Sequence, residues 1–493
     1  METKGVHKQL KRPFILASVM LGMFLAAIEA TIVATAMPSI VADLGGFSLY
    51  SWVFSAYLLT NAATVLIFGK LADIFGRKPI FIIGVTVFLI GSTLAGFSTS
   101  IGMLIFTRFI QGVGAGALMP IATTIVGDIY NRAERAKIQG YLSAVWGISA
   151  VSGPLLGGFF VDVLDWRYVF WMNIPLGILA MLGIAIFLKE DIEKKKEKVD
   201  YFGSLLMMFS VSIIMIILVE GGTGIPWNSI LMYGMIIVAV LFLGSFIKQQ
   251  QKSLEPMIPI ELWKYRLILM ANLTSLTTGM ITIGVTSYLP AFVQGVMGKS
   301  ATIAGFTLTT MSIGWPIAST ISGRLLLRIG YRNTSIIGGV FLIIGSIFFL
   351  LLTPDKGPVW AGIGSFFVGV GMGMTSTSFI VGIQTSVDWE IRGIATSANV
   401  FMRSLGNALG VALLGGVLNS YIQSQINQAN LSSEISIDSV NKLLNEEEVS
   451  ELSSKAITVL ENGLTGGLHI IYIGMFILTI ISVIFILLMP KEE

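Results

Sequence analysis

The sequence contains no cysteine, and its only two histidines are His7 and His469. Without thiols the chain has no disulfide, no thiolate nucleophile and no cysteine-ligated metal. Each histidine lies near the edge of an apolar segment, so we expect no histidine metal site and no cofactor. Charge is also scarce, because Asp, Glu, Lys and Arg make up 12% of the residues, about half of their share in an ordinary soluble domain.

Apolar residues, in contrast, are abundant and make up 54% of the chain. They form uninterrupted runs such as 14–28, 79–98 and 467–489, and a helix of such a run can cross an apolar layer about 30 Å thick. A period of two is absent from these runs, which disfavours a β-barrel and leaves helices to satisfy the backbone in lipid. The sequence therefore predicts an all-α membrane protein.

Charged residues, proline and glycine divide the chain into fourteen predicted transmembrane helices. They cover residues 14–37, 50–71, 79–98, 101–126, 138–161, 166–188, 201–220, 230–248, 267–293, 303–325, 335–353, 358–385, 393–418 and 467–489. With both termini in the cytoplasm, 24 of the 31 Lys and Arg residues fall in inside segments and 5 in outside segments. This asymmetry follows the positive-inside rule and predicts a multi-pass membrane protein with both termini in the cytoplasm.

An internal repeat predicts two similar halves. The pattern of glycines and basic residues in 69–78 returns in 323–332, at an offset of 254, and Leu-Leu-Gly-Gly at 155–158 returns at 413–416. We therefore expect a six-helix bundle over 1–188, a linker with two inserted helices over 189–265, and a second six-helix bundle over 266–493. Its outside loop, 419–466, is rich in Ser, Asn and Glu and is expected to be either a solvated cap with one surface helix or a plain spacer.

Five motifs carry a resemblance to a known family. They are the loop Gly69–Lys78 with Asp73, Gly76 and Arg77, the stretch Leu104–Gly114 with Arg108, the helix Ser149–Gly158 with Gly153 and Pro154, the segment Trp166–Gly177, and Glu29–Pro38. The chain resembles the major facilitator superfamily, in particular its fourteen-helix drug:proton antiporters. Two departures are Ser149, where the family usually has glycine, and Glu29, where it usually has aspartate.

The resemblance implies a conformational switch at the cytoplasmic edge of the first half. Asp73, Gly76, Arg77 and Asp128 would form a gate latch that holds the outward-facing state, and an Arg77–Asp128 pair can be made in one state and broken in the other. The alternative is that the basic residues of this loop serve only to fix topology. Gly153 and Pro154 allow a kinked, closely packed helix, which suits either a flexible seam or plain packing.

Glu29 is the candidate proton-coupling residue. A charge near mid-bilayer costs roughly 2.5 to 3.5 kcal/mol, so an acid inside a span is a functional candidate. At 1.5 Å per residue, Glu29 lies about 12 Å and Arg108 about 10 Å below the outer surface, so the two can meet if their helices are neighbours. Glu29 then either carries protons or forms a structural ion pair with Arg108. Protons would be the coupling ion.

The candidate substrate-binding residues are aromatic, methionine, amide and basic side chains within the spans. They are Met23, Trp52, Tyr57, Asn61, Gln111, Trp146, Tyr288, Gln294, Trp315, Gln384, Asn399 and Arg403. Apolar walls with few polar groups suit lipophilic ligands. Any one of these residues could instead serve only helix packing, and no acid inside a span of the second half is available to pair with Arg403.

These features predict a monomeric, proton-coupled exporter of lipophilic drugs or antimicrobial compounds that works by alternating access. Its partners would be small lipophilic molecules and membrane lipids, and a net charge of +3 is too small to indicate nucleic acid. The alternatives are an exporter of a lipid, siderophore or metabolite, and a non-transporting membrane scaffold. An enzyme is not expected, because no phosphate-cradling loop, metal cluster or Ser-His-Asp set is present.

Overall fold

The computed structural model describes residues 2–130, 132–190, 200–221, 224–253, 260–387, 391–444 and 449–490, and it contains helices and no strands within these ranges. The first group of helices is α1 (Glu2–Leu44), η1 (Phe47–Leu49), α2 (Tyr50–Phe75), α3 (Arg77–Gly96), α4 (Ile101–Ile129), α5 (Arg132–Val163), α6 (Tyr168–Trp171) and α7 (Asn173–Phe187). An intervening pair is α8 (Tyr201–Glu220) and α9 (Ile230–Lys252). The last group is η2 (Ile260–Lys264), α10 (Arg266–Gly295), α11 (Ala301–Leu350), η3 (Pro354–Lys356), α12 (Gly357–Ser386), α13 (Arg392–Gln428), η5 (Ile437–Ser439), α14 (Val440–Leu444), η6 (Val449–Glu451) and α15 (Ser454–Leu487).

Thirteen helices of the described residues are long and apolar enough to cross a membrane. One of them, α11, has 50 residues, so at 1.5 Å per residue it is about 75 Å long. That is more than twice the thickness of an apolar layer of about 30 Å. Gly330 has non-helical angles (φ 79°, ψ 171°) and divides α11 into two passes. Fourteen spans result, which confirms the predicted number.

Two glycines mark the internal repeat in the backbone. Gly76, between α2 and α3, has φ 97° and ψ 154°, and Gly330, inside α11, has φ 79° and ψ 171°. A residue with a Cβ atom is strained in this region, which only glycine adopts readily. The two glycines lie at equivalent positions of the sequence repeat, so both halves use the same tight corner between two helices.

Polar residues at the ends of the apolar runs fix where several helices begin. Side chains accept a hydrogen bond from the third backbone amide of the helix that follows, and these caps are Ser100, Asp200, Ser229, Ser300 and Ser453. Such a cap satisfies an amide that has no partner within the helix. These helices therefore begin where a polar segment of the sequence gives way to an apolar one.

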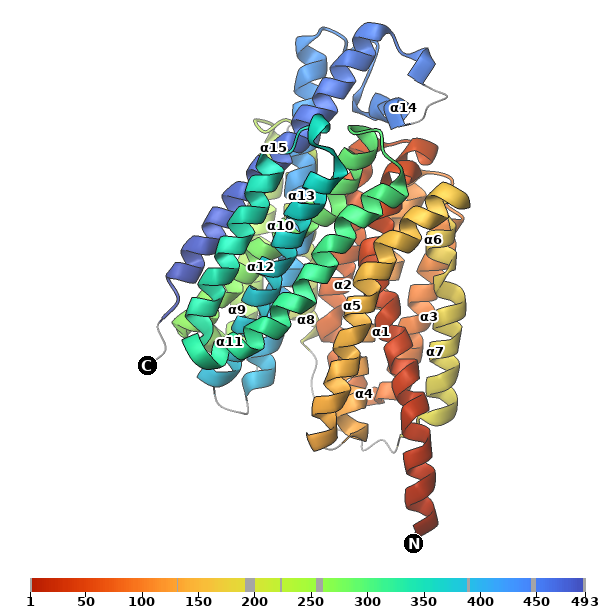
Figure 1. Ribbon diagram of the computed structural model, residues 1–493, viewed down its shortest axis with the longest axis vertical. Coiled ribbons are helices and arrows are strands. Elements are labelled where there is room, and N and C mark those ends of the chain that lie inside the picture. The colour runs from red at the N-terminus through yellow and green to blue at the C-terminus, as the bar shows by residue number, and fades with distance from the viewer. Residues whose placement is uncertain are drawn as a thin grey trace.

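The helices form two bundles side by side (Figure 1). Helices α1–α7 pack on one another to form the first half, and α10–α13 with α15 form the second. The halves meet where α5 packs on α11 and where α2 packs on α13. We call the end of the molecule that carries α14 the loop end. Helix α1 begins and α15 ends at the opposite end, which we call the terminal end (Figure 1).

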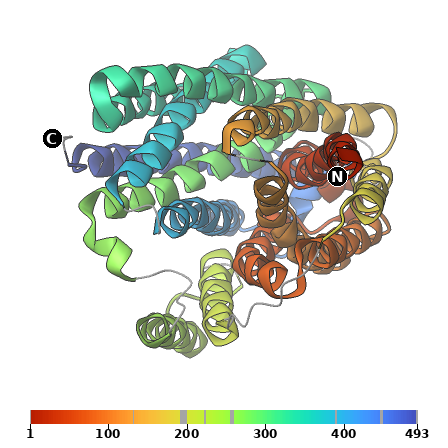
Figure 2. The same ribbon diagram turned by 90° about the horizontal axis from the view of Figure 1, so that it is seen from below.

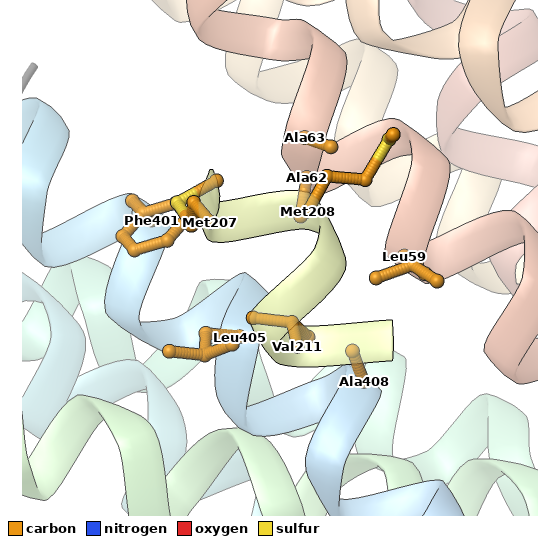
Figure 3. Close-up of a pocket in the computed structure, with 9 residues that line it drawn as sticks. All are labelled: Leu59, Ala62, Ala63, Met207, Met208, Val211, Phe401, Leu405 and Ala408. Atoms are coloured by element: carbon orange, nitrogen blue, oxygen red, sulfur yellow. The ribbon is translucent and has the colours of Figure 1, made fainter. Parts of the chain in front are cut away.

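The inserted pair α8 and α9 lies at the edge of the molecule beside both halves (Figure 2). Only α8 touches the halves closely, and it packs on both α2 and α13. A small apolar pocket lies between these three helices (Figure 3). It is lined by Leu59, Ala62, Ala63, Met207, Met208, Val211, Phe401, Leu405 and Ala408. The inserted pair therefore covers one side of the boundary between the halves.

The outside loop predicted over 419–466 is shorter in the structure. Helix α13 continues to Gln428 and α15 already begins at Ser454, so both helices project beyond the expected spans. The segment between them buries Leu431, Ile437 and Val440 in the main apolar core. The sequence analysis did not identify these few apolar residues, because most of the loop is polar. Their burial holds the segment against the bundle.

Candidate functional site

Glu29 on α1 and Arg108 on α4 form an ion pair in the interior of the first half. Arg108 Nη1 donates to Glu29 Oε1 and, at 2.7 Å, to Gln111 Oε1. The second carboxylate oxygen of Glu29 accepts from Asn173 Nδ2 at 2.9 Å. The exposed fractions of Glu29 and Arg108 are 0% and 1%. The structure therefore brings together the two residues whose depths matched in the sequence, and it adds Asn173 of α7.

A second layer of contacts holds Arg108 and Asn173 in place. The guanidinium carbon of Arg108 lies 4.3 Å from the centre of the Tyr57 ring, and its Nε donates to the carbonyl of Val53 at 3.3 Å. Asn173 Nδ2 also donates to Ser92 Oγ at 2.9 Å. These contacts link α2, α3, α4 and α7 around one carboxylate. A change in the charge of Glu29 would therefore alter the contacts among these four helices of the first half.

The ion pair is closed off in this conformation. Glu29 and Arg108 have almost no exposed surface, so a proton can reach the carboxylate only after the surrounding helices move. Removing one partner of such a buried pair typically costs about 3–5 kcal/mol, because the other charge is left without compensation. The geometry fits either a proton site that opens in another conformation or a structural ion pair.

A second group of charges lies at the terminal end, around the start of α3. Arg77 Nε lies 2.9 Å from Asp128 Oδ2 at the end of α4. The carboxylate of Glu190 accepts from the backbone amides of Arg77 at 2.8 Å and Lys78 at 2.9 Å. These contacts join parts of the first half to one another. The side chain of Asp73, the remaining member of the predicted latch, lies outside the described residues.

Helix α5 contacts both halves through its glycines. A Cβ atom on Gly153 would lie 2.0 Å from Thr31 Oγ1 of α1, and one on Gly158 would lie 2.5 Å from the Cα atom of Thr302 of α11. Pro154 is also in contact across the boundary, because a Cβ atom on Gly305 would lie 2.3 Å from its carbonyl oxygen. The helix stays continuous through Pro154. These positions form a close-packed seam, as small residues allow.

All hydrogen bonds found between described residues of the two halves lie toward the loop end. The hydroxyl of Tyr50 donates to the Ser287 carbonyl at 2.7 Å, and Gln294 Nε2 donates to the Thr35 carbonyl at 3.0 Å. The Ser48 amide donates to Asp438 at 2.9 Å. In addition, Asp162 accepts from the amides of Ala301 at 3.2 Å and Thr302 at 3.0 Å, and Asn419 donates to the Ser48 carbonyl at 2.7 Å.

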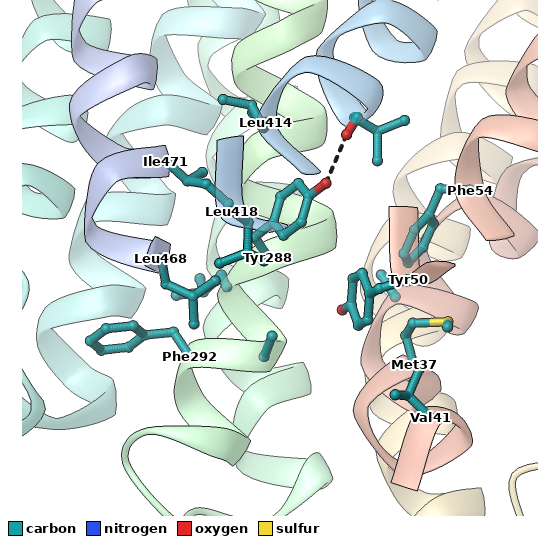
Figure 4. Close-up of a cluster of buried hydrophobic side chains, with 14 of the residues drawn as sticks. Met37, Val41, Tyr50, Phe54, Tyr288, Phe292, Leu414, Leu418, Leu468 and Ile471 are labelled. Carbon is teal, nitrogen blue, oxygen red and sulfur yellow. Dashed lines mark hydrogen bonds between the residues drawn. The ribbon is translucent and has the colours of Figure 1, made fainter. Parts of the chain in front are cut away.

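Apolar contacts close the same end. Figure 4 shows Met37, Val41 and Phe54 of the first half facing Tyr288 and Leu418 of the second, and all of them belong to one buried cluster. The ring centres of Tyr50 and Tyr288 lie 5.9 Å apart across the boundary. The structure thus has its two halves joined by both polar and apolar contacts at the loop end.

Comparison with known proteins identifies the family. A model described as Major Facilitator Superfamily matches residues 19–411. The chain is 38% identical over 422 residues to Multidrug resistance protein 3 of Bacillus subtilis (strain 168), covering 86% of this chain and 82% of the relative. It is 36% identical over 416 residues to Multidrug transporter protein MdtP of the same organism, covering 84% and 76%. The chain belongs to the major facilitator superfamily.

Solved structures of other transporters share this fold. A bacterial homolog to the human lysosomal transporter Spinster, in an inward-facing and unoccupied conformation, matches with a TM-score of 0.70 and 16% identity, over 97% of this chain and 96% of the other. A mutant of the nucleoside transporter NupG matches with a TM-score of 0.64 and 13% identity, over 97% and 100%. The major facilitator fold and the efflux relatives make the chain a transporter and not an enzyme.

The predicted substrate-binding residues of this major facilitator protein lie at several places in the two halves. Gln111 and Tyr57 contact Arg108, and Met23 is buried in the core of the first half. Tyr288 and Gln294 donate across helix contacts, to the carbonyls of Val411 and Thr35, and Trp52 Nε1 donates to Glu220 at 3.3 Å. None of the twelve residues lines the pocket of Figure 3.

The remaining members of that set divide into three kinds. Trp146 and Gln384 are exposed, and Asn61 is half-buried. Asn399 is buried and donates to Asn272 and Ser275 of α10. Arg403 and Trp315 contact one another through a cation–π interaction. Their roles in binding stay predictions.

Several site residues were missed by the sequence analysis. Glu190 lies in the segment predicted to be a linker, although its carboxylate caps the start of α3. Asp162 and Asp438 accept hydrogen bonds from the opposite half, and no local pattern marks them. An acid at the end of an apolar helix is a weak signal, because most such acids simply face water.

Proposed function

We propose that this transporter exports lipophilic compounds, antimicrobial drugs among them, across a bacterial cytoplasmic membrane in exchange for protons. Two Bacillus relatives are by name a multidrug resistance protein and a multidrug transporter, which supports the substrate class. The protein would act as a monomer with both termini in the cytoplasm, and its other contacts would be membrane lipids. The loop end would then face outward and the terminal end would face the cytoplasm.

The proposed mechanism is alternating access between the two halves. In the conformation described, hydrogen bonds such as those from Tyr50 to Ser287 and from Asn419 to Ser48 hold the loop end together. The opposite conformation would break these bonds and close the terminal end, where Arg77 and Asp128 lie. Because the same sequence must be stable in both, the two sets of contacts would differ by only a few kcal/mol.

The observation that carries proton coupling is the burial of Glu29. Among the described residues it is the only acid without exposed surface, and its sole charged partner is Arg108. Protonation of Glu29 would leave Arg108 without a counter-ion, so the proton would favour whichever conformation lets Arg108 reach water or another acceptor. A ligand shifts such an equilibrium only by its difference in affinity between the two states.

Reconstitution into liposomes tests this proposal. A pH gradient should drive a lipophilic fluorescent dye against its concentration gradient in the parent protein. In Glu29→Gln we expect this pH-driven transport to fall to background, while exchange of labelled for unlabelled dye across the membrane continues. Exchange needs no net proton movement, so it reports on substrate binding and on the movement of the halves alone.

A double variant separates the proton site from a structural ion pair. If the pair is only structural, Glu29→Gln should impair both pH-driven transport and exchange, and neutralising Arg108 as well should restore both. Undiminished pH-driven transport in Glu29→Gln would exclude Glu29 as the coupling residue. A parent protein that moves no dye under any gradient would contradict the proposed export itself.

A further inference from the structure

Arg403 lies in the middle of the second half. It is about 16 Å along α13 from the first residue, Arg392, at 1.5 Å per residue. The side chain is half-buried, and its guanidinium faces the ring of Trp315 on α11. Arg403 therefore points toward another helix of the second half and not to the bilayer.

Among the described residues, the guanidinium interacts with one aromatic ring. The guanidinium carbon lies 5.9 Å from the ring centre of Trp315 on α11. Helix α11 packs mainly on α12, α5 and α15, whereas α13 packs on α10, α15 and α2. Trp315 and Arg403 thus belong to helices that are not close neighbours, and their side chains meet across the space between those helices.

Arg403 contrasts with the other arginine inside a span. Arg108 has a carboxylate, an amide oxygen and a carbonyl as partners. No hydrogen bond or ion pair joins the guanidinium of Arg403 to any described residue, and the Asn399 amide, one helical turn earlier, donates to Asn272 and Ser275. A cation–π contact of this length offsets only a part of the cost of holding a charge inside a membrane protein.

We infer that Arg403 and Trp315 bind the carboxylate and the flat apolar body of a lipophilic aromatic acid, and the inference rests on the proposed export function. A guanidinium binds a carboxylate through two parallel hydrogen bonds, and few other side chains supply that geometry. The indole ring offers a face on which an aromatic ligand can stack. The two side chains extend from different helices, so one ligand would bridge α11 and α13.

Two probes of nearly equal shape test the charge requirement. Pyrenebutyrate carries the carboxylate, and pyrenebutyramide replaces it with a neutral amide. Binding to the purified full chain is measured through energy transfer from tryptophan to pyrene. We expect the parent protein to bind pyrenebutyrate more tightly. In Arg403→Gln the affinity for pyrenebutyrate should fall about tenfold or more, which is about 1.4 kcal/mol or more, while that for the amide stays unchanged.

Matched variants make the result specific. Arg324→Gln removes the same charge from an exposed position on α11 and should change neither affinity. Arg403→Lys keeps the positive charge but cannot form the two parallel hydrogen bonds of a guanidinium, so it should give an intermediate affinity for pyrenebutyrate. The unchanged binding of pyrenebutyramide shows that each variant is folded.

Several outcomes would overturn the inference. Pyrenebutyrate binding that is equal in the parent and in Arg403→Gln excludes a carboxylate contact, and an equal loss of both probes shows that Arg403 serves the fold. If anionic phospholipid or chloride at ordinary concentrations abolishes the preference for pyrenebutyrate, the site holds a lipid head group or an inorganic anion. A parent protein that binds only the amide, or neither probe, contradicts this site alone, whereas the proposed export function is contradicted only if the reconstituted protein moves no dye.

Discussion

Asp162, in the first half, caps the N-terminus of α11 in the second half by accepting a hydrogen bond from the backbone amide of Thr302 at 3.0 Å. The same carboxylate accepts from the Ala301 amide at 3.2 Å. A carboxylate at this position also interacts favourably with the positive end of the helix dipole. The bond exists only while the two halves are together at the loop end, so Asp162 stabilises that conformation selectively.

We predict that Asp162→Ala shifts the protein toward conformations that are open at the loop end. A helix cap contributes about 1 kcal/mol, which is roughly a fivefold change in an equilibrium constant. Ser51 is buried at the same end, close to Gly415 of α13. Because the chain has no cysteine, Ser51→Cys supplies a single thiol. Its reaction with a charged maleimide should become roughly fivefold faster in Asp162→Ala.

Asp165 provides the control for this prediction. It lies on the same side of the molecule but pairs with Arg167 inside the first half, at 3.2 Å. Asp165→Ala should leave the labelling rate of Ser51→Cys unchanged. Equal acceleration in both variants would mean that the labelling reports a general loosening and that Asp162 has no special role.

The two corner glycines should be sensitive to a single methyl group. We expect Gly76→Ala and Gly330→Ala each to destabilise the protein by about 1–3 kcal/mol, because alanine is strained at these φ and ψ angles. Gly69→Ala and Gly323→Ala are matched controls, since a Cβ atom at either helical position meets no neighbour. These controls should be neutral or slightly stabilising. Melting temperatures in detergent would compare all four, and equal effects at corner and control positions would contradict the assignment.

The interior ion pair should be far more costly to break than a surface pair. Arg108→Met leaves Glu29 buried without a counter-charge, and we expect a loss of about 3–5 kcal/mol in the free energy of unfolding. Arg167→Met removes partly exposed pairs with Asp43 and Asp165, and each should cost about 0–1 kcal/mol. Adding Glu29→Gln to Arg108→Met should recover a part of the loss. A strictly additive double variant would show that the two charges do not interact.

The architecture was predictable because its signals are long or repeated. The distribution of Lys and Arg fixed the number of spans, and the glycines at 76 and 330 marked equivalent corners of the two halves. The depths of Glu29 and Arg108 also followed from simple helix geometry. Each of these inferences needed only the rise of a helix, the thickness of a bilayer or the offset of a repeat.

The details of the site were not predictable, because they depend on contacts between distant segments. Asp162 and Thr302 are adjacent only after both halves have formed, and no sequence pattern near either residue predicts the hydrogen bond between them. The predicted substrate-binding residues were chosen by type, and type does not show which way a side chain faces. Met23 and Tyr288 are buried in this conformation, and their roles in binding stay predictions.

The contacts of α8 constrain any motion of the halves. Its C-terminal end accepts a hydrogen bond from Trp52 of α2 through Glu220, and the next residue, Gly221, accepts one from Ser420 of α13. If the bundles rotate against each other, at least one of these tethers has to lengthen. The inserted helices would then move with one bundle and slide over the other. The pocket between α8, α2 and α13 is lined by apolar side chains, which have no hydrogen bonds for such sliding to break.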